Sequence, residues 1–150
     1  MTAVTVADDA IVEETTIEAP AERIFRALTR PEELLRWWAA EGKFRAVAVD
    51  CDVRPGGAWW MQVEGSCAGD GPVHTVRGVY RRVEAPRLVE FTWQRDGEEW
   101  PESLVRWELE EKGGATRVRV THAGLTSEAM RARNVGWPLI VKLLEAWMER

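Results

Sequence analysis

The stretch "VRPGGAWWMQV", residues 53–63, places two adjacent tryptophans just after a Pro-Gly-Gly turn, in a segment with the composition of a β-strand. Neighbouring side chains of a strand point to opposite faces of a sheet, so one of Trp59 and Trp60 faces the core and the other faces away. A three-residue hairpin loop at 55–57 would place the apolar side chains of both strands on one face. The resulting pairs are Val53 with Trp59, Cys51 with Met61, and Val49 with Val63. A two-residue loop would reverse this parity, leaving more charge on the apolar face. We therefore predict that Trp59 points inward.

The chain from residue 44 to residue 122 continues as short runs of alternating apolar and polar residues, separated by turn residues. With one run before them, these runs predict seven strands, at 10–19, 44–53, 58–64, 74–83, 87–94, 103–110 and 115–122. One face of the later strands is apolar, and the opposite face carries Arg77, Arg81, Glu90, Arg106, Glu108, Arg117 and Arg119. Because the connections between these strands are short, the pattern predicts an antiparallel sheet with one buried face.

Helical patterns lie on either side of this series of strands. Pro20 and Pro31 each stand where a helix can begin, which predicts two short helices between the first and second strands. Near the C-terminus, apolar residues recur at helical spacing, namely Trp137, Ile140, Val141, Leu144 and Met148. Pro138 predicts either a kink or a fresh helical start in this segment. We expect this C-terminal helix to cover the apolar face of the sheet.

Length and charge limit what kind of protein this is. The 150 residues predict a single domain, 1–150, with residues 1–9 as a loose N-terminal arm. A formal charge of −5 without a cluster of Lys and Arg argues against binding to nucleic acid. We also expect no membrane span, because no apolar run approaches the ~20 residues that one requires. The two cysteines, Cys51 and Cys67, form no disulfide framework, and the start of the chain does not resemble a signal peptide, which together predict a cytoplasmic protein.

The aromatic composition is unusual, with nine tryptophans against one tyrosine and three phenylalanines. The predicted register places five ring-bearing residues on the inner face of the sheet, namely Trp59, Tyr80, Trp93, Trp107 and His122. Large rings can fill a core, or they can line a pocket in the space between a curved sheet and a helix. With so many rings on one face, we favour a pocket.

The ordered motifs of the chain resemble one family over residues 11–148. They are "IEAPAERIFRALTRPEELLRWWA", "DVRPGG", "RGVYRRVEAPRLVEFTW", "VRWELEEKGGATRVRVTHAG" and "GWPLIVKLLEAW". The sequence is similar to the bacterial single-domain branch of the activator-of-heat-shock-ATPase-like proteins, within the SRPBCC (START and birch-pollen-allergen-like) superfamily. The resemblance implies an α+β helix-grip fold, in which a curved antiparallel sheet wraps around a C-terminal helix. It also implies relatives that bind hydrophobic molecules or lipids, cyclise polyketides or assist a chaperone ATPase.

From these patterns we expect the protein to bind a small hydrophobic or amphipathic molecule between the sheet and the C-terminal helix. The residues expected to contact it are Trp59, Met61, His74, Tyr80, Phe91, Trp93, Trp107, His122, Trp137, Val141 and Leu144. Within this set, His74 or His122 would orient the ligand.

We assign no catalytic residue, no metal ligand and no cofactor. The two histidines lack partners at metal-binding spacing. The motif "GSCAG" around Cys67 is followed by a strand, whereas a nucleophile elbow leads into a helix.

Two alternative functions stay open at this point. The first is an aromatase/cyclase-like enzyme in which an inner histidine moves protons on a hydrophobic substrate. The second is a co-chaperone-like module, or a homodimer, that binds its partner through the outer face of the sheet around Trp60.

Overall fold

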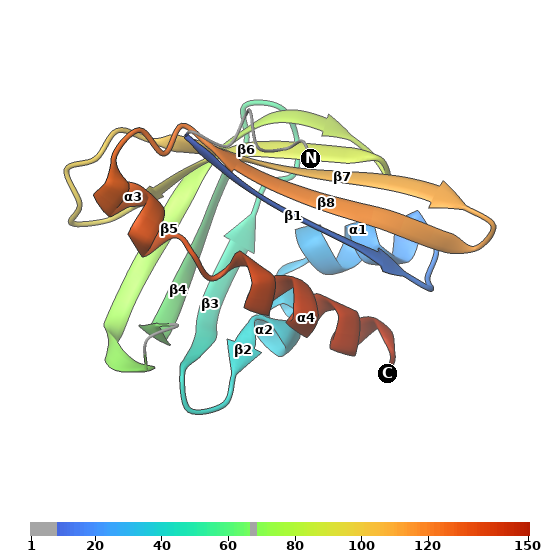
Figure 1. The fold of residues 1–150 in the computed structure, drawn as a ribbon, viewed down its shortest axis with the longest axis horizontal. Helices are drawn as coiled ribbons and strands as arrows, with labels where there is room; N and C mark the ends of the chain where they lie inside the picture. The colour runs from blue at the N-terminus through green and yellow to red at the C-terminus, as the bar shows by residue number, and fades with distance from the viewer. Residues whose placement is uncertain (1–8, 67–68) are drawn as a thin grey trace.

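The computed structural model describes residues 9–66 and 69–150, which form one curled antiparallel sheet with helices on its concave side (Figure 1). The strands are β1 (Ala10–Ile17), β2 (Ala39–Ala40), β3 (Phe44–Cys51), β4 (Ala58–Ser66), β5 (Gly69–Glu84), β6 (Leu88–Arg95), β7 (Ser103–Lys112) and β8 (Ala115–Ala123). The helices are α1 (Ala21–Thr29), α2 (Pro31–Trp37), α3 (Glu128–Arg133) and α4 (Trp137–Met148). This arrangement confirms the predicted α+β helix-grip fold.

The sheet has eight strands in the order β1-β8-β7-β6-β5-β4-β3-β2, one more than the seven predicted. The additional strand is β2, whose two residues pair with β3 and are too few to show alternation in the sequence. Helices α1 and α2 carry the chain from one edge of the sheet to the other, so that β1 pairs with β8 instead of with the next strand in sequence. No helix in residues 9–66 and 69–150 is long and apolar enough to cross a membrane.

The inward direction of Trp59 is confirmed, since its exposed fraction is 5%, against 38% for Trp60. The predicted pairing of this hairpin is wrong by two residues, because Cys51 lies opposite Trp59 and Val49 lies opposite Met61. A shift of two residues keeps Cys51 and Val49 on their predicted face, whereas the third predicted pair is wrong by three residues, because Val63 lies opposite Ala46. The inference about burial therefore survives the error in pairing.

The loop between β3 and β4 explains this shift. The loop is longer than a three-residue turn, because β3 ends at Cys51 and β4 begins at Ala58. Its tip turns toward β5, where the Gly56 amide donates to the Tyr80 carbonyl (2.8 Å) and the Tyr80 amide donates to the Gly57 carbonyl (2.9 Å). The pairing is further interrupted by an irregularity between Ala46 and Ala48.

Strands β5 and β6 approach closely at Gly78, and Trp59 packs and forms a hydrogen bond at this point. Trp59 lies opposite Gly78 on β5, and its indole Nε1 donates to the Thr92 carbonyl on β6 (3.1 Å). A Cβ at Gly78 would lie 1.8 Å from the same carbonyl oxygen. The Thr92 hydroxyl in turn accepts a hydrogen bond from the Val79 amide (2.8 Å). Only a residue without a side chain permits this contact between β5 and β6.

The C-terminal helix covers the sheet as expected, but the segment forms two helices instead of one. Helix α4 starts anew at Trp137 with Pro138 in its first turn, after the separate helix α3. This confirms the fresh start among the two outcomes predicted from Pro138. The side chains that α4 buries against the sheet and the other helices are Trp137, Ile140, Val141 and Leu144.

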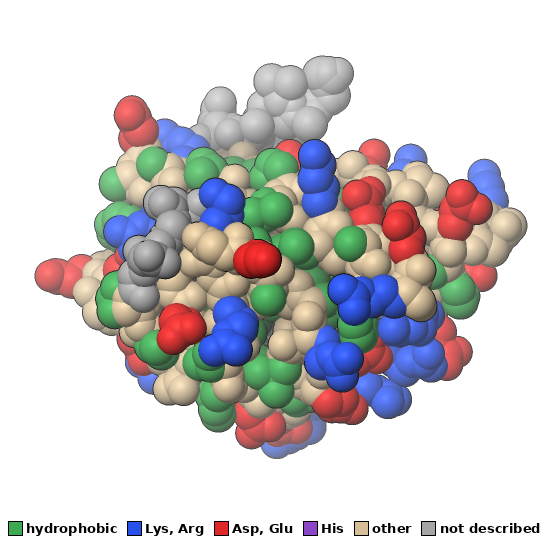
Figure 2. Space-filling model, turned by 90° about the horizontal axis from the view of Figure 1, so that it is seen from below, with side chains coloured by type: hydrophobic (Ala, Val, Ile, Leu, Met, Phe, Trp, Pro, Cys, Tyr) green, Lys and Arg blue, Asp and Glu red, His purple; other side chains and the backbone are tan. Residues whose placement is uncertain are grey.

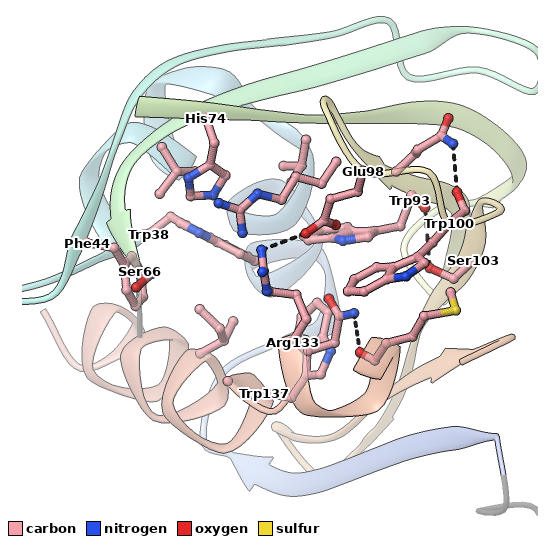
Figure 3. Close-up of a pocket in the computed structure, with 18 of the residues that line it drawn as sticks. Trp38, Phe44, Ser66, His74, Trp93, Glu98, Trp100, Ser103, Arg133 and Trp137 are labelled. Atoms are coloured by element: carbon pink, nitrogen blue, oxygen red, sulfur yellow. Dashed lines mark hydrogen bonds and ion pairs between the residues drawn. The ribbon is translucent and has the colours of Figure 1, made fainter. Parts of the chain in front are cut away.

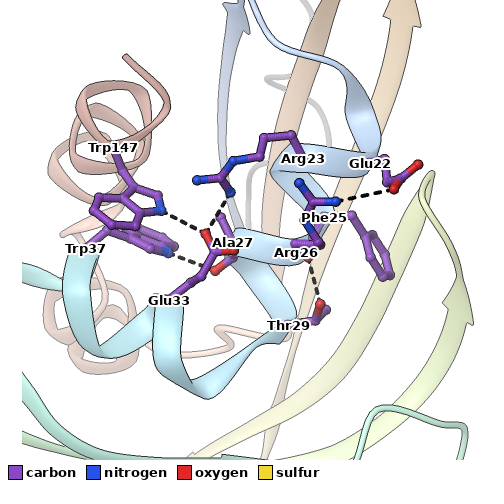
Figure 4. A network of polar contacts seen from close by, with 9 residues as sticks. All are labelled: Glu22, Arg23, Phe25, Arg26, Ala27, Thr29, Glu33, Trp37 and Trp147. Atoms are coloured by element: carbon purple, nitrogen blue, oxygen red, sulfur yellow. Dashed lines mark hydrogen bonds and ion pairs between the residues drawn. The ribbon is translucent and has the colours of Figure 1, made fainter. Parts of the chain in front are cut away.

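Three of the helices are joined by Glu33 of α2 (Figure 4). Its carboxylate accepts from Arg23 of α1 (2.7 Å) and from the Trp147 indole of α4 (2.9 Å). Burial alone raises the pKa of Glu33, but the hydrogen bonds from Trp147 and Arg23 outweigh it and hold the pKa below its ordinary value. The folded state therefore favours the ionised carboxylate.

The convex face of the sheet is charged, as predicted, and neighbouring strands share ion pairs such as Arg119 with Glu14 (2.8 Å) and Arg117 with Glu110 (2.6 Å). Glu90 departs from this pattern, because its side chain is buried beneath an ion pair with Arg106 (2.6 Å). Figure 2 shows the molecule from below, with acidic and basic side chains interspersed on that face as well. Exposed pairs of this kind each contribute only about 0–1 kcal/mol to stability.

We predict that Gly78→Ala lowers the free energy of unfolding by about 2 kcal/mol or more, because β5 or β6 must move to admit the Cβ. Val79→Ala is the matched control, since the Val79 side chain is exposed, and we expect it to cost less than about 1 kcal/mol. Urea unfolding monitored by tryptophan fluorescence measures both values. Equal stabilities of the two variants would contradict the close approach at Gly78.

We predict that Glu33→Gln lowers the free energy of unfolding by about 1 kcal/mol at pH 7, whereas Glu32→Gln, at the adjacent exposed position, has little effect. A pKa lowered by folding stabilises the protein above the unfolded-state pKa, and this contribution is lost as the pH falls through the folded-state pKa. The difference between the two variants should therefore shrink in acid. Urea unfolding at pH 7 and at a series of acidic pH values well below 4.5 tests this, and a difference that stays constant over the whole series would exclude the electrostatic explanation.

Candidate ligand-binding pocket

A cavity of about 150 Å³ opens between the sheet and the segment that contains α3 and the start of α4 (Figure 3). Strands β3 to β7 form its walls, together with the loop between β6 and β7 and the residue that follows α2. The aromatic residues that line it are Trp38, Phe44, Trp93, Trp100 and Trp137. The cavity is therefore bounded mainly by flat rings that belong to different elements of the fold.

Three of the indole rings that line the cavity, those of Trp38, Trp93 and Trp137, pack against one another. The ring of Trp137 lies 6.2 Å from that of Trp38 and 5.7 Å from that of Trp93, and the Trp38 and Trp93 rings are 6.5 Å apart. The first pair meets edge to face and the other two are tilted, which are geometries that aromatic pairs favour over face-to-face stacking. All three rings line the cavity.

A chain of hydrogen bonds runs behind this wall. The Trp137 indole Nε1 donates to Nδ1 of His122 (3.0 Å), and Nε2 of His122 lies 2.7 Å from the Ser103 hydroxyl. Because an indole can only donate, Nδ1 accepts, and the proton of the neutral ring sits on Nε2. The Ser103 hydroxyl then accepts from His122 and donates to the Trp93 carbonyl (3.3 Å).

These bonds decide what His122 can do. The ring is completely buried, and burial lowers its pKa to about 4. Since Nε2 already carries a proton, His122 cannot take one from Ser103 in this arrangement. The pair therefore lacks the geometry of a nucleophile with its general base. Ser103 lines the cavity, whereas His122 lies behind it and positions Ser103 and Trp137.

His74 differs from His122, because it lines the cavity directly. Its Nδ1 is buried and has no hydrogen-bond partner among the described residues. Burial, and then the positive charges of Arg95 and Arg133, lower the pKa of His74. The ring is thus kept neutral at the cavity wall, where Nδ1 can accept or donate a single hydrogen bond.

The opening of the cavity is polar and combines two cations with one anion. Arg133 of α3 pairs with Glu98 of the β6–β7 loop (2.6 Å), and its guanidinium lies 5.8 Å from the centre of the Trp100 ring. Arg95, at the end of β6, also lines the cavity. The side-chain amide of Gln94 donates to the Trp100 carbonyl (3.1 Å) and fastens the loop to β6.

The structure divides the residues predicted to contact a ligand into three groups. His74, Trp93 and Trp137 line the cavity. A second, smaller space of about 30 Å³ is bounded by Trp93 and Trp137 again and by Trp59, Met61, Tyr80, Phe91 and Trp107. The remaining residues, His122, Val141 and Leu144, are buried and line neither space. A volume of about 30 Å³ is that of a single water molecule, so the second group packs as core.

Sequence reasoning missed most of the residues at the opening and part of the aromatic wall, namely Trp38, Phe44, Arg95, Glu98, Trp100 and Arg133. Trp38 follows a helix, and Trp100 and Glu98 lie in a loop, where no periodicity indicates a direction. The pattern "DGEEWP", with a tryptophan in a polar turn, was the one available signal.

Two segments for which the sequence made a prediction lie outside the described residues. They are Cys67 and residues 1–8 of the predicted N-terminal arm. Within the part of the chain that the structure describes, no group of three or more His, Cys, Asp or Glu side chains could hold a metal ion.

We predict that the His122 ring stays neutral until the pH approaches about 4. The unfolded chain titrates this group near pH ~6.5 and so binds the proton more tightly than the folded state, and stability falls as the pH drops from about 6.5 toward 4. Because the chain has two histidines, His74→Gln leaves His122 as the only one, and ¹⁵N NMR of its ring follows the titration directly. Titration above pH 6 would contradict the complete burial of the His122 ring.

Comparison with known proteins supports the fold. The profile of the family described as "Activator of Hsp90 ATPase homolog 1-like protein" matches residues 18–149. None of the curated proteins searched matches the chain.

Similar solved structures cover nearly the whole chain. A protein of Chromobacterium violaceum shares 24% identity with a TM-score of 0.80, covering 95% of this chain and 98% of that one. An AHSA1-like protein of Aeromonas hydrophila shares 25% identity with a TM-score of 0.76, covering 93% and 92%. A protein of Mycobacterium smegmatis shares 20% identity with a TM-score of 0.81, covering 94% and 91%.

Proposed function

The chain belongs to the family of Activator of Hsp90 ATPase homolog 1-like proteins, and from this premise we propose that it binds a small hydrophobic or amphipathic molecule in the cavity between the sheet and helices α3 and α4. The observation that carries the proposal is a cavity of about 150 Å³ lined by aromatic rings, next to a second space of only about 30 Å³.

The size and walls of the cavity indicate the class of ligand. An engineered apolar cavity of about 150 Å³ in another protein stays dry and binds benzene, so a space of this volume accepts a molecule of one ring. Each Å² of apolar surface that such a ligand buries contributes about 25 cal/mol before the costs of ordering are deducted. The walls around Trp38, Phe44 and Trp137 would supply most of this burial.

Polar groups at the wall would orient the ligand. The free Nδ1 of His74 and the Ser103 hydroxyl both belong to the cavity lining, on different strands. Ligand pockets typically combine an apolar lining with a few such polar groups. Of the two histidines proposed to orient the ligand, His74 lines the cavity and would contact it directly, while His122 would act through Ser103.

We predict that phenylacetamide, a neutral probe of one ring, shifts the indole N–H resonances of the cavity tryptophans in ¹H–¹⁵N spectra. Val76→Phe fills the cavity from β5 and should abolish these shifts. Val79→Phe is the matched control, because the Val79 side chain is exposed on the same strand, and it should bind the probe like the unmodified protein. Ile140→Phe fills the cavity from α4 and provides a second test if Val76→Phe does not fold.

A molecule retained from the cell would be seen by native mass spectrometry. The intact protein should show a reproducible mass excess that disappears when the same sample is denatured, and Val76→Phe should lack it. A clean mass together with the absence of any shift by phenylacetamide would count against a binding pocket.

A further inference from the structure

We infer that the ligand is a small aromatic carboxylate whose anionic group is bound at the opening of the cavity by Arg95 and Arg133. This inference rests on the proposed function and adds the charge of the ligand to it. The evidence is the arrangement of charged groups around an aromatic cavity of limited volume.

The charges that line the cavity do not balance. Its ionised side chains are Arg95 and Arg133, which are cations, and Glu98, which is an anion. His74 is the further titratable group in the lining, and it is kept neutral by burial and by the two arginines. The lining therefore carries a net charge of +1, in a protein whose formal net charge is −5. A positive opening on an acidic protein would attract an anion and reject a cation.

Arg95 is the cation without a countercharge. Among the described residues it forms no ion pair and no hydrogen bond through its guanidinium, although its side chain is partly buried. Burial, and then the nearby charge of Arg133, lower the pKa of Arg95, while Glu98 compensates only in part. Two guanidinium groups that repel each other across a cavity opening are stabilised when an anion lies between them.

Arg133 is held in place for such a contact. Its Nη1 donates to Glu98 (2.6 Å), and its planar group lies over the Trp100 ring (5.8 Å). A guanidinium has five N–H donors, so this ion pair leaves further donors available. Because Glu98 and Trp100 already restrict the side chain, little rotamer entropy is lost when an anion binds. Figure 3 shows Arg133, Glu98 and His74 around the same space.

The aromatic part of the cavity indicates the size and chemistry of the uncharged part of the ligand. Trp38, Trp93 and Trp137 enclose a volume that accepts about one ring. The net charge of +1 matches a monoanion, which favours a carboxylate over a dianionic phosphate. Together these features favour a ring that bears a carboxylate on a short arm.

Phenylacetate and phenylacetamide have nearly the same shape and differ in charge, so they test the inference directly. Titration calorimetry and indole N–H shifts should show phenylacetate binding about 10-fold or more tightly than phenylacetamide. Arg95→Gln should remove most of this preference, because phenylacetate binding weakens far more than phenylacetamide binding. Arg133→Gln should remove it as well, because Glu98 then faces the anion without its partner.

Arg81→Gln is the matched control. Arg81 is an exposed arginine on β5 that pairs with Glu102 (3.5 Å) and does not line the cavity, so the preference for phenylacetate should persist. Raising the salt concentration should weaken phenylacetate binding more than phenylacetamide binding.

The outcomes separate this inference from the proposed function. If the two compounds bind equally, and Arg95→Gln changes neither, the pocket stands and the anionic ligand is excluded. If neither compound shifts any indole resonance, both the inference and the binding of a one-ring molecule are overturned. A preference that survives in Arg95→Gln and Arg133→Gln but is lost in Arg81→Gln would place the anion outside the cavity and overturn the inference as well.

Discussion

The hydrogen bond from the Trp137 indole to His122 joins the first turn of α4 to the sheet, and the shape of the cavity depends on it. Through the same ring, Ser103 is tied to β8 and then to the Trp93 carbonyl. A neutral, fully buried histidine can serve this purpose because both ring nitrogens have partners. The wall of the pocket is thus built on a satisfied polar network, where an unpaired group would cost stability.

The aromatic residues perform two different tasks on one face of the sheet. Around Trp59 and Tyr80 they fill the space and leave only room for about one water molecule. Toward α3, the rings of Trp38, Trp93 and Trp137 line a cavity of about 150 Å³. Residues of both α3 and α4 line the larger cavity, whereas α4 contributes Trp137 to the smaller space.

Charge is also distributed between two environments. On the convex face of the sheet, ion pairs such as Arg119 with Glu14 lie in solvent and contribute little to stability. At the cavity opening, Arg133 is as exposed as Arg119 but lies over the Trp100 ring and pairs with Glu98, whose side chain is 19% exposed. Arg95, which also lines the cavity, is partly buried. The same residue type therefore forms exposed ion pairs in one place and a candidate binding site in the other.

The sequence by itself determined the strands, the two faces of the sheet and the inward direction of Trp59, because alternation and helical spacing are local properties of the chain. The eighth strand and the pairing at Cys51 could not be predicted from the sequence, since they depend on loops that pack against distant strands. Of the candidate site, His74, Trp93 and Trp137 were predicted, while the arginines at the opening were not. Only the tertiary structure decided which rings fill space and which enclose it, because that depends on the distance between elements far apart in sequence.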